Sequence, residues 1–255
     1  MLLRLEQRPE ASKSMVYLSP LIAVVMTIVT AMFMFALLGV DPIKAVSTFF
    51  IEPISSLDGL TELCVKATPL ILIGVGLAIG FQANVWNIGA EGQLVIGALA
   101  GGGLALAFYD QSSIFLVPAM LICGTLGGLA WAAIPAWLKT RFNTNEILTS
   151  LMLTYVGLLV LSYLVHGPWK DPEGMNFPES RLFHDSALLP ILINETRLNV
   201  GWLLALLAVA LGWALISRHI VGFQVKVIGM APFAGAFAGF KEKKLIWITL
   251  LISGG

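Results

Sequence analysis

Residues 67–109 read ATPLILIGVGLAIGFQANVWNIGAEGQLVIGALAGGGLALAFY and contain a single charged side chain, Glu91. A helix needs about 20 apolar residues to cross the hydrocarbon core of a membrane. This stretch of 43 residues is too long for one crossing, and its polar middle, Asn84–Gln93, is where two crossings would turn. The segment therefore predicts a pair of transmembrane helices.

The rest of the chain has the same apolar character. Of its 255 residues, 58% are hydrophobic and 12% are charged, whereas a soluble domain carries about a quarter charged residues. The mean hydropathy is +0.88. Further uncharged runs of spanning length cover residues 15–40, 111–138, 147–165 and 198–217, and another apolar run begins at Leu245. We predict an all-α, polytopic transmembrane bundle with six complete spans and the start of a seventh.

The two ends of the chain complete this prediction. Met15–Val40 is longer than the apolar core of a signal peptide, about 7–15 residues, so it is interpreted as the first span behind a cytoplasmic tail of residues 1–14. The last apolar run stops at Gly255, and a half-crossed helix would leave backbone groups unsatisfied in lipid. We therefore expect a C-terminal truncation, with residues 1–255 forming part of a single transmembrane domain.

The placement of Lys and Arg predicts the orientation, because cytoplasmic loops carry an excess of them. With the N-terminus inside, residues 166–199 form an external loop and residues 218–244 a cytoplasmic loop. The ten basic residues that then lie inside are Arg4, Arg8, Lys13, Lys139, Arg141, Arg218, Lys226, Lys241, Lys243 and Lys244. The five that lie outside are Lys44, Lys66, Lys170, Arg181 and Arg197.

The polar segment Asn84–Gln93 is the first candidate functional site. If it is helical, Asn84, Asn87 and Glu91 share one face, and polar groups within membrane segments usually face a cavity or the bundle interior. The alternative is a cytoplasmic turn whose polar side chains are hydrated or cap the helices. The aromatic residues nearby either stack on a substrate or pack. The candidate path residues are Phe81, Asn84, Trp86, Asn87, Glu91 and Gln93.

A second candidate lies in the cytoplasmic loop, where Val227–Gly239 is rich in small residues. Pro232 suits the first turn of a helix that is too short to span a membrane. Such a helix is suited to docking into a cleft of another protein, and the alternative is an interfacial helix that touches only lipid headgroups. The candidate docking residues are Gly229, Ala231, Pro232, Phe233, Ala234, Gly235 and Gly239.

The sequence lacks the motifs that several classes of enzyme and metal-binding protein require. The sequence contains no G-x-x-x-x-G-K-[ST], H-E-x-x-H or G-x-S-x-G pattern, so we expect neither ATP hydrolysis on this chain nor an embedded hydrolase. His166, His184 and His219 are far apart, and Cys64 and Cys123 belong to no metal-binding pattern. We expect no metal and no cofactor. The net charge of zero gives no reason to expect nucleic-acid binding.

Four segments, in order along the chain, resemble one family. Asn87-Ile-Gly-Ala-Glu-Gly-Gln93 resembles the N-x-G-x-E-G-Q signature of ABC importer permeases for branched-chain amino acids, simple sugars and nucleosides. Phe142–Tyr155 and Gly167–Pro172 are similar to the nucleoside and simple-sugar branch, and Gly222–Gly239 to the cytoplasmic coupling loop. In that loop, Ala231, Gly235 and Phe240 replace the Asn, Ala and Ile that are common in the family.

The resemblance implies a permease subunit in the plasma (inner) membrane of a prokaryote. Its partners would be cytoplasmic ABC ATPase subunits, a second, homologous permease subunit and an external substrate-binding lipoprotein. The two permease subunits would form the path for nucleosides or simple sugars, with nucleosides favoured over free pentoses and branched-chain amino acids third.

Three other classes of function are weaker hypotheses. An ion-coupled secondary transporter of small polar solutes would need charged side chains within its spans, and Glu91 alone lies firmly inside an apolar stretch. A membrane enzyme would need a nucleophile with a base, or a metal cluster. A scaffold role would explain neither polar segment.

Overall fold

The computed structural model describes residues 12–255 except residues 112 and 176. Arg4, Arg8 and most of the predicted tail 1–14 lie outside the described residues. Helices dominate the described part, and six are long and apolar enough to cross a membrane. These six cover Ser14–Leu37, Leu57–Gln82, Ala90–Ala107, Leu116–Phe142, Glu146–His166 and Gly201–Arg218. They confirm the predicted all-α bundle with six spans.

The chain divides into two units, residues 1–63 and residues 64–255. The first unit contains α1 (Lys13–Leu37), α2 (Pro42–Phe50), α3 (Glu52–Ser55) and the first turns of α4 (Leu57–Gln82). The side chain of Asp41 accepts hydrogen bonds from the backbone of Ile43 and Lys44 and caps α2, whose first residue is Pro42. Phe49 of α2 stacks on Phe35 of α1 with ring centroids 6.0 Å apart. The short helix α2 is thereby held against the end of the first span.

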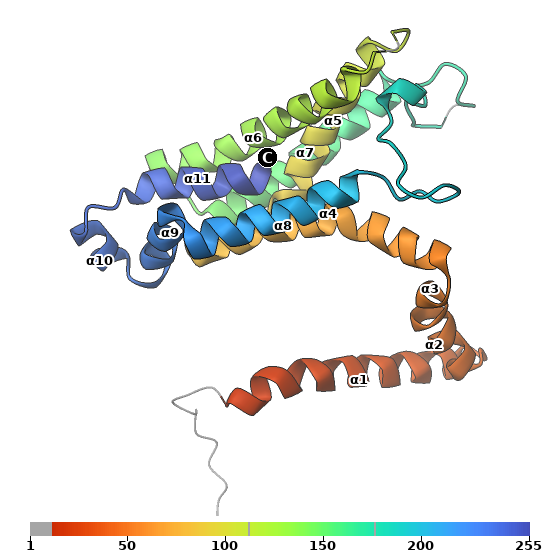
Figure 1. The fold of residues 1–255 in the computed structure, drawn as a ribbon, viewed down its shortest axis with the longest axis horizontal. Coiled ribbons are helices and arrows are strands. Elements are labelled where there is room, and N and C mark those ends of the chain that lie inside the picture. The colour runs from red at the N-terminus through yellow and green to blue at the C-terminus, as the bar shows by residue number, and fades with distance from the viewer. Residues whose placement is uncertain (1–11, 112, 176) are drawn as a thin grey trace, which may run out of the picture. The chain divides into compact units, whose positions relative to one another are not determined.

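The second unit contains the rest of α4 and the remaining helices (Figure 1). These are α5 (Ala90–Ala107), α6 (Leu116–Phe142), α7 (Glu146–His166), α8 (Gly201–Arg218), α9 (Ile220–Met230), α10 (Pro232–Phe237), α11 (Glu242–Gly254) and the 3-10 turn η1 (Asp185–Ala187). Helix α5 packs against α6 and α7, and α11 runs along α6. The predicted start of a seventh span is thus helical from Glu242.

Glycines allow these helices to approach closely. A Cβ atom on Gly97 of α5 would lie 2.9 Å from the carbonyl oxygen of Gly124 in α6, and one on Gly101 would lie 3.0 Å from that of Met120. Small residues at helix contacts let backbones approach, and van der Waals packing then stabilises the pair in lipid. The α5–α6 contact is therefore close-packed along its length.

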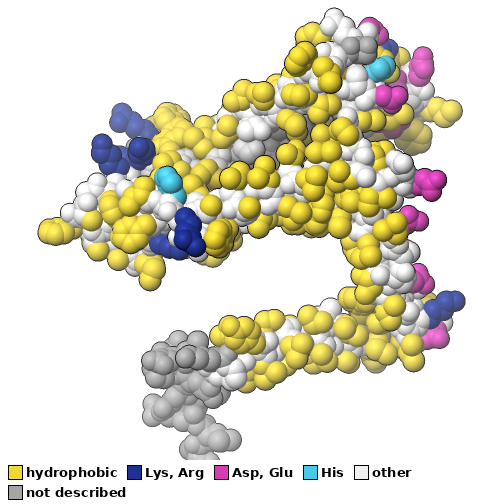
Figure 2. Space-filling view, in the orientation of Figure 1, with side chains coloured by type: hydrophobic (Ala, Val, Ile, Leu, Met, Phe, Trp, Pro, Cys, Tyr) yellow, Lys and Arg dark blue, Asp and Glu magenta, His cyan; other side chains and the backbone are white. Residues whose placement is uncertain are grey.

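Charges are distributed unequally between the two ends of the second unit (Figure 2). Lys and Arg gather at the end formed by α9, α10 and the start of α11, whereas Asp and Glu gather at the opposite end. The basic residues in these helices and at the ends of α6 and α8 are Lys139, Arg141, Arg218, Lys226, Lys241, Lys243 and Lys244. The two predicted loops, 166–199 and 218–244, thus lie at opposite ends, and the side of the membrane that each faces stays a prediction.

Candidate functional site

The helix breaks between α4 and α5, over residues 83–89. Asn84 has a left-handed backbone (φ 56°), and residues 85–89 after it have no regular secondary structure. Their burial alternates with the period of two that is typical of an extended chain. Ala83, Val85, Asn87 and Gly89 are buried, whereas Asn84, Trp86 and Ile88 are exposed. The helical alternative, in which Asn84, Asn87 and Glu91 share one face, is therefore wrong, because the segment is not helical until Ala90.

Neighbouring helices cover the buried side of this segment. The backbone N–H of Ile88 donates to the Ser150 hydroxyl of α7 over 3.1 Å. A Cβ on Gly89 would lie 2.7 Å from the carbonyl oxygen of Ser150, and one on Gly92 would lie 2.6 Å from the Cα atom of Thr154. Non-helical backbone at membrane depth is tolerated only where protein or a water-filled cavity surrounds it. Because Gly89 and Gly92 have no Cβ atom, α7 can pack directly against the start of α5 and cover the buried side of this segment.

Asn87 and Gln93 form a buried amide pair. Each side chain is 2% exposed. Asn87 Nδ2 donates to Gln93 Oε1 over 2.8 Å, and Gln93 Nε2 donates back to Asn87 Oδ1 over 3.3 Å. Asn87 Nδ2 also donates to Ser253 Oγ of α11 over 2.8 Å. These two predicted path residues therefore hold the broken helix together in this conformation, and neither faces an open surface.

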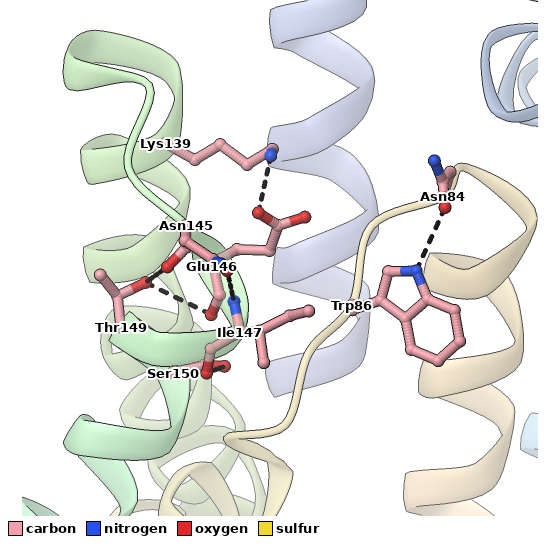
Figure 3. A network of polar contacts seen from close by, with 8 residues as sticks. All are labelled: Asn84, Trp86, Lys139, Asn145, Glu146, Ile147, Thr149 and Ser150. Atoms are coloured by element: carbon pink, nitrogen blue, oxygen red, sulfur yellow. Dashed lines mark hydrogen bonds and ion pairs between the residues drawn. The ribbon is translucent and has the colours of Figure 1, made fainter.

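The exposed side of the segment has a different chemistry. The rings of Phe81 and Trp86 lie with centroids 4.7 Å apart at an angle of 39°, and Trp86 Nε1 donates to Asn84 Oδ1 over 3.1 Å. Figure 3 shows the Trp86 ring at the end of α4 beside Asn84. Phe81 and Asn84 line an open pocket of about 610 Å³, together with Ala78, Gln82, Gly229 and Met230. Glu91, the remaining predicted path residue, is exposed in the first turn of α5.

The turn between α6 and α7 carries an ion pair that sequence reasoning missed. Lys139 Nζ lies 2.6 Å from Glu146 Oε2 (Figure 3), with 22% and 9% of the side chains exposed. Asn143 ends α6 in the left-handed region, and the Asn145 side chain caps α7 by accepting from the N–H of Ile147. The sequence did contain a signal for this ion pair, because the acidic Glu146 follows the basic Lys139 by seven positions across a short polar turn.

The predicted docking loop is ordered around a short helix. Helix α10 begins at Pro232, as expected, and Gly239 (φ 82°) follows it in the left-handed region. Gly229 of α9 packs directly against the backbone of Gln82 and Ala83, so that a Cβ atom there would collide with it. Gly235 is buried against α9. The large side chains Met230, Phe233 and Phe237 are 87%, 91% and 97% exposed.

The predicted external loop, residues 166–199, contacts the C-terminal end of α5. Trp169 lies against Gly103 and Phe183 against Gly102, with ring atoms 3.0 and 3.2 Å from where a Cβ atom would stand. Isolated bridges join Lys170 to Ser180 and Ile191 to Asn199. The segment is thereby tied to the bundle.

Within the described residues, no group of three or more His, Cys, Asp or Glu side chains is placed to hold a metal ion. Cys64 and Cys123 are free and half-buried.

Six helices of spanning length, with a polar break between α4 and α5, define a multi-pass membrane protein. Residues 59–255 match the family described as the permease component of branched-chain amino acid transport systems. The chain belongs to this family.

Its relatives include permeases with named substrates. The chain is 34% identical to the glucose ABC transporter permease protein TsgB13 of Haloferax volcanii, over 99% of this chain and 68% of that one. It is 30% identical to the guanosine ABC transporter permease protein NupP of Bacillus subtilis, over 93% and 68% of the two chains. It is 25% identical to the nucleoside ABC transporter permease protein NupB of Lactococcus lactis, over 95% and 69%. No solved structure is significantly similar to the chain.

The protein is therefore a permease subunit of an ABC transporter and a multi-pass protein of the plasma membrane. This confirms the predicted permease over the ion-coupled secondary transporter. Its family implies that it works with ATPase and binding-protein partners.

Proposed function

We propose that this chain forms the translocation path of an importer for nucleosides or simple sugars. Relatives named for glucose, guanosine and nucleosides support this substrate class. The observation that carries the proposal is the pocket lined by Phe81, whose ring lies tilted against that of Trp86, at the end of a helix that breaks inside the bundle. A flat aromatic face binds a nucleobase by stacking, which contributes about 1–3 kcal/mol per base.

The path runs along the exposed side of segment 83–89. Phe81, Asn84 and Trp86 contact the passing solute, and the Asn84 carboxamide offers it both donors and acceptors. Glu91 lies further along, where α5 begins. Asn87 and Gln93 belong to the path as its support, because their side chains are buried on the other side of the same segment.

The basic end of the second unit faces the cytoplasm. The excess of Lys and Arg at that end supports this orientation, which puts α10 inside and segment 166–199 outside. The outer segment then meets an external substrate-binding lipoprotein. A second, homologous permease subunit completes the path.

Helix α10 docks into a separate cytoplasmic ATPase subunit. Its tip presents Phe233 and Phe237, with Met230 just before it, nearly fully exposed between basic flanks. Buried aromatic anchors carry much of the energy of a protein interface. The double variant Phe233→Ala/Phe237→Ala is expected to lose the ATPase subunit on co-purification in detergent. Leu182→Ala, which shortens an 88% exposed side chain of the outer segment, is the matched control and is expected to retain it.

Uptake by the full-length transporter in liposomes tests the function. With ATP inside and the ATPase subunits present, labelled guanosine or labelled glucose is expected to accumulate. Competition between unlabelled nucleosides, ribose, glucose and leucine then identifies the class of substrate. ATP-independent accumulation by the permease alone contradicts the driven importer, and uptake inhibited only by leucine contradicts the substrate class.

A further inference from the structure

The hydroxyl of Ser253 is the point at which α11 holds the non-helical segment 83–89. It accepts a hydrogen bond from the Nδ2 atom of Asn87, which lies 166 positions earlier in the chain. The rest of the Asn87 carboxamide is also occupied. It donates to Gln93 Oε1, and its oxygen accepts from Gln93 Nε2 and from the N–H of Gly89. Because a carboxamide has two N–H donors and two acceptor lone pairs, every hydrogen-bonding position of Asn87 is filled.

Helix α11 links this bond to the docking loop. Residues 238–241 join α10 to α11, and the N–H of Phe240 donates to the carbonyl oxygen of Gly235 in α10. Helix α11 has 13 residues and is therefore about 20 Å long at 1.5 Å per residue. It packs in one core with α9, α6 and the non-helical segment 83–89. This core is made of Ala83, Val85, Ala136, Val225, Ile228, Leu245, Ile246 and Leu250. Since such cores are close-packed, they transmit displacement with little loss.

The contacts around Ser253 leave little slack. A Cβ atom on Gly76 of α4 would lie 2.7 Å from the Cα atom of Ser253. The next residue, Gly254, packs directly against Gly128 and Ala132 of α6. On the exposed side of segment 83–89, the residue next to Asn87 is Trp86, whose ring lies against Phe81, and Phe81 lines the pocket. Ser253 therefore links α11 directly to Asn87, the residue next to Trp86.

We propose that Ser253 and Asn87 are positioning residues that couple α10 to the aromatic pair Phe81–Trp86, so that movement of the docking loop reshapes the pocket. This inference rests on the proposed docking of α10 to an ATPase. Ser253 acts through Asn87, because its hydroxyl is bonded to the buried carboxamide and lies on the side of the segment away from the pocket.

The experiment measures how ATP changes access to the pocket in the full-length transporter with its ATPase subunits. A single cysteine is placed at Asn84→Cys, with Cys64 and Cys123 replaced by Ala. The rate of its modification by a water-soluble maleimide is measured with ATP and without. Four forms are compared in this background: Ser253 unchanged, Ser253→Ala, Ser253→Thr, which keeps a hydroxyl, and Thr249→Val. Thr249 is buried in α11, and among the described residues its hydroxyl donates to carbonyl oxygens of its own helix, those of Leu245 and Ile246.

ATP is expected to change the rate when Ser253 is intact and in the Ser253→Thr and Thr249→Val forms. In Ser253→Ala the response is expected to shrink about fivefold, the effect of losing one hydrogen bond. A retained response in Ser253→Ala, an equal loss in Thr249→Val, or no response with Ser253 intact would overturn the coupling. Uptake by the parent transporter is measured in parallel, so failure of the proposed function is recognised separately.

Discussion

Replacing Lys139 with Met removes one partner of the ion pair at the turn between α6 and α7. The Glu146 side chain is only 9% exposed and lies 2.6 Å from the ammonium group, so its carboxylate would be left buried and unpaired. Breaking a fully buried pair costs about 3–5 kcal/mol. The cost is smaller here for two reasons. The Lys139 side chain is 22% exposed, and the first turn of α7 stabilises the negative charge of Glu146. We therefore expect the free energy of unfolding to fall by about 2–3 kcal/mol.

The double variant Lys139→Met/Glu146→Leu is expected to recover most of this loss, because replacing both partners with apolar side chains leaves no charge buried. The free energy of unfolding is measured by titrating SDS into detergent micelles and following tryptophan fluorescence. A change of 2–3 kcal/mol shifts the equilibrium constant about 30- to 150-fold.

Lys243→Met removes the same charge from an exposed site at the start of α11 and is the control. A loss in Lys139→Met no larger than in Lys243→Met would refute the reasoning. So would a double variant as unstable as the single one.

Two further predictions concern α4 and the pocket. Gly76→Ala is expected to lower the free energy of unfolding by about 1–3 kcal/mol, because its Cβ atom would lie 2.7 Å from Ser253 Cα. The control is Gly74→Ala, where a Cβ atom would meet nothing within 4 Å. In the same SDS titration, this control is expected to be neutral or stabilising. Equal losses would contradict this packing. Trp86→Ala is expected to raise the KM for guanosine uptake about 5- to 150-fold by removing a stacking surface worth about 1–3 kcal/mol. The control Trp137→Ala, at a similarly exposed ring on α6, is expected to leave the KM unchanged, and a matched rise there would contradict a specific role.

Span length and charge placement were predictable because each is a local property of the sequence. The start of α10 was predictable for the same reason, since Pro232 fixes its own backbone and lacks the N–H that a first turn leaves unpaired. The break was harder. Residues 83–89 show a period of two only once their burial is known, and that burial depends on α7 and α11. No local pattern shows that Ser253 lies opposite Asn87.

The structure also gives a physical reason for most of the Asn87–Gln93 signature. Asn87 and Gln93 replace, with side-chain amides, part of the hydrogen bonding that a continuous helix would have supplied through its backbone. Gly89 and Gly92 are small because α7 passes against them at Ser150 and Thr154. Glu91 is different, because among the named positions of the signature it is the exposed one. Packing of this chain alone does not require a carboxylate there, so its role is to be sought in what passes or docks beside α5.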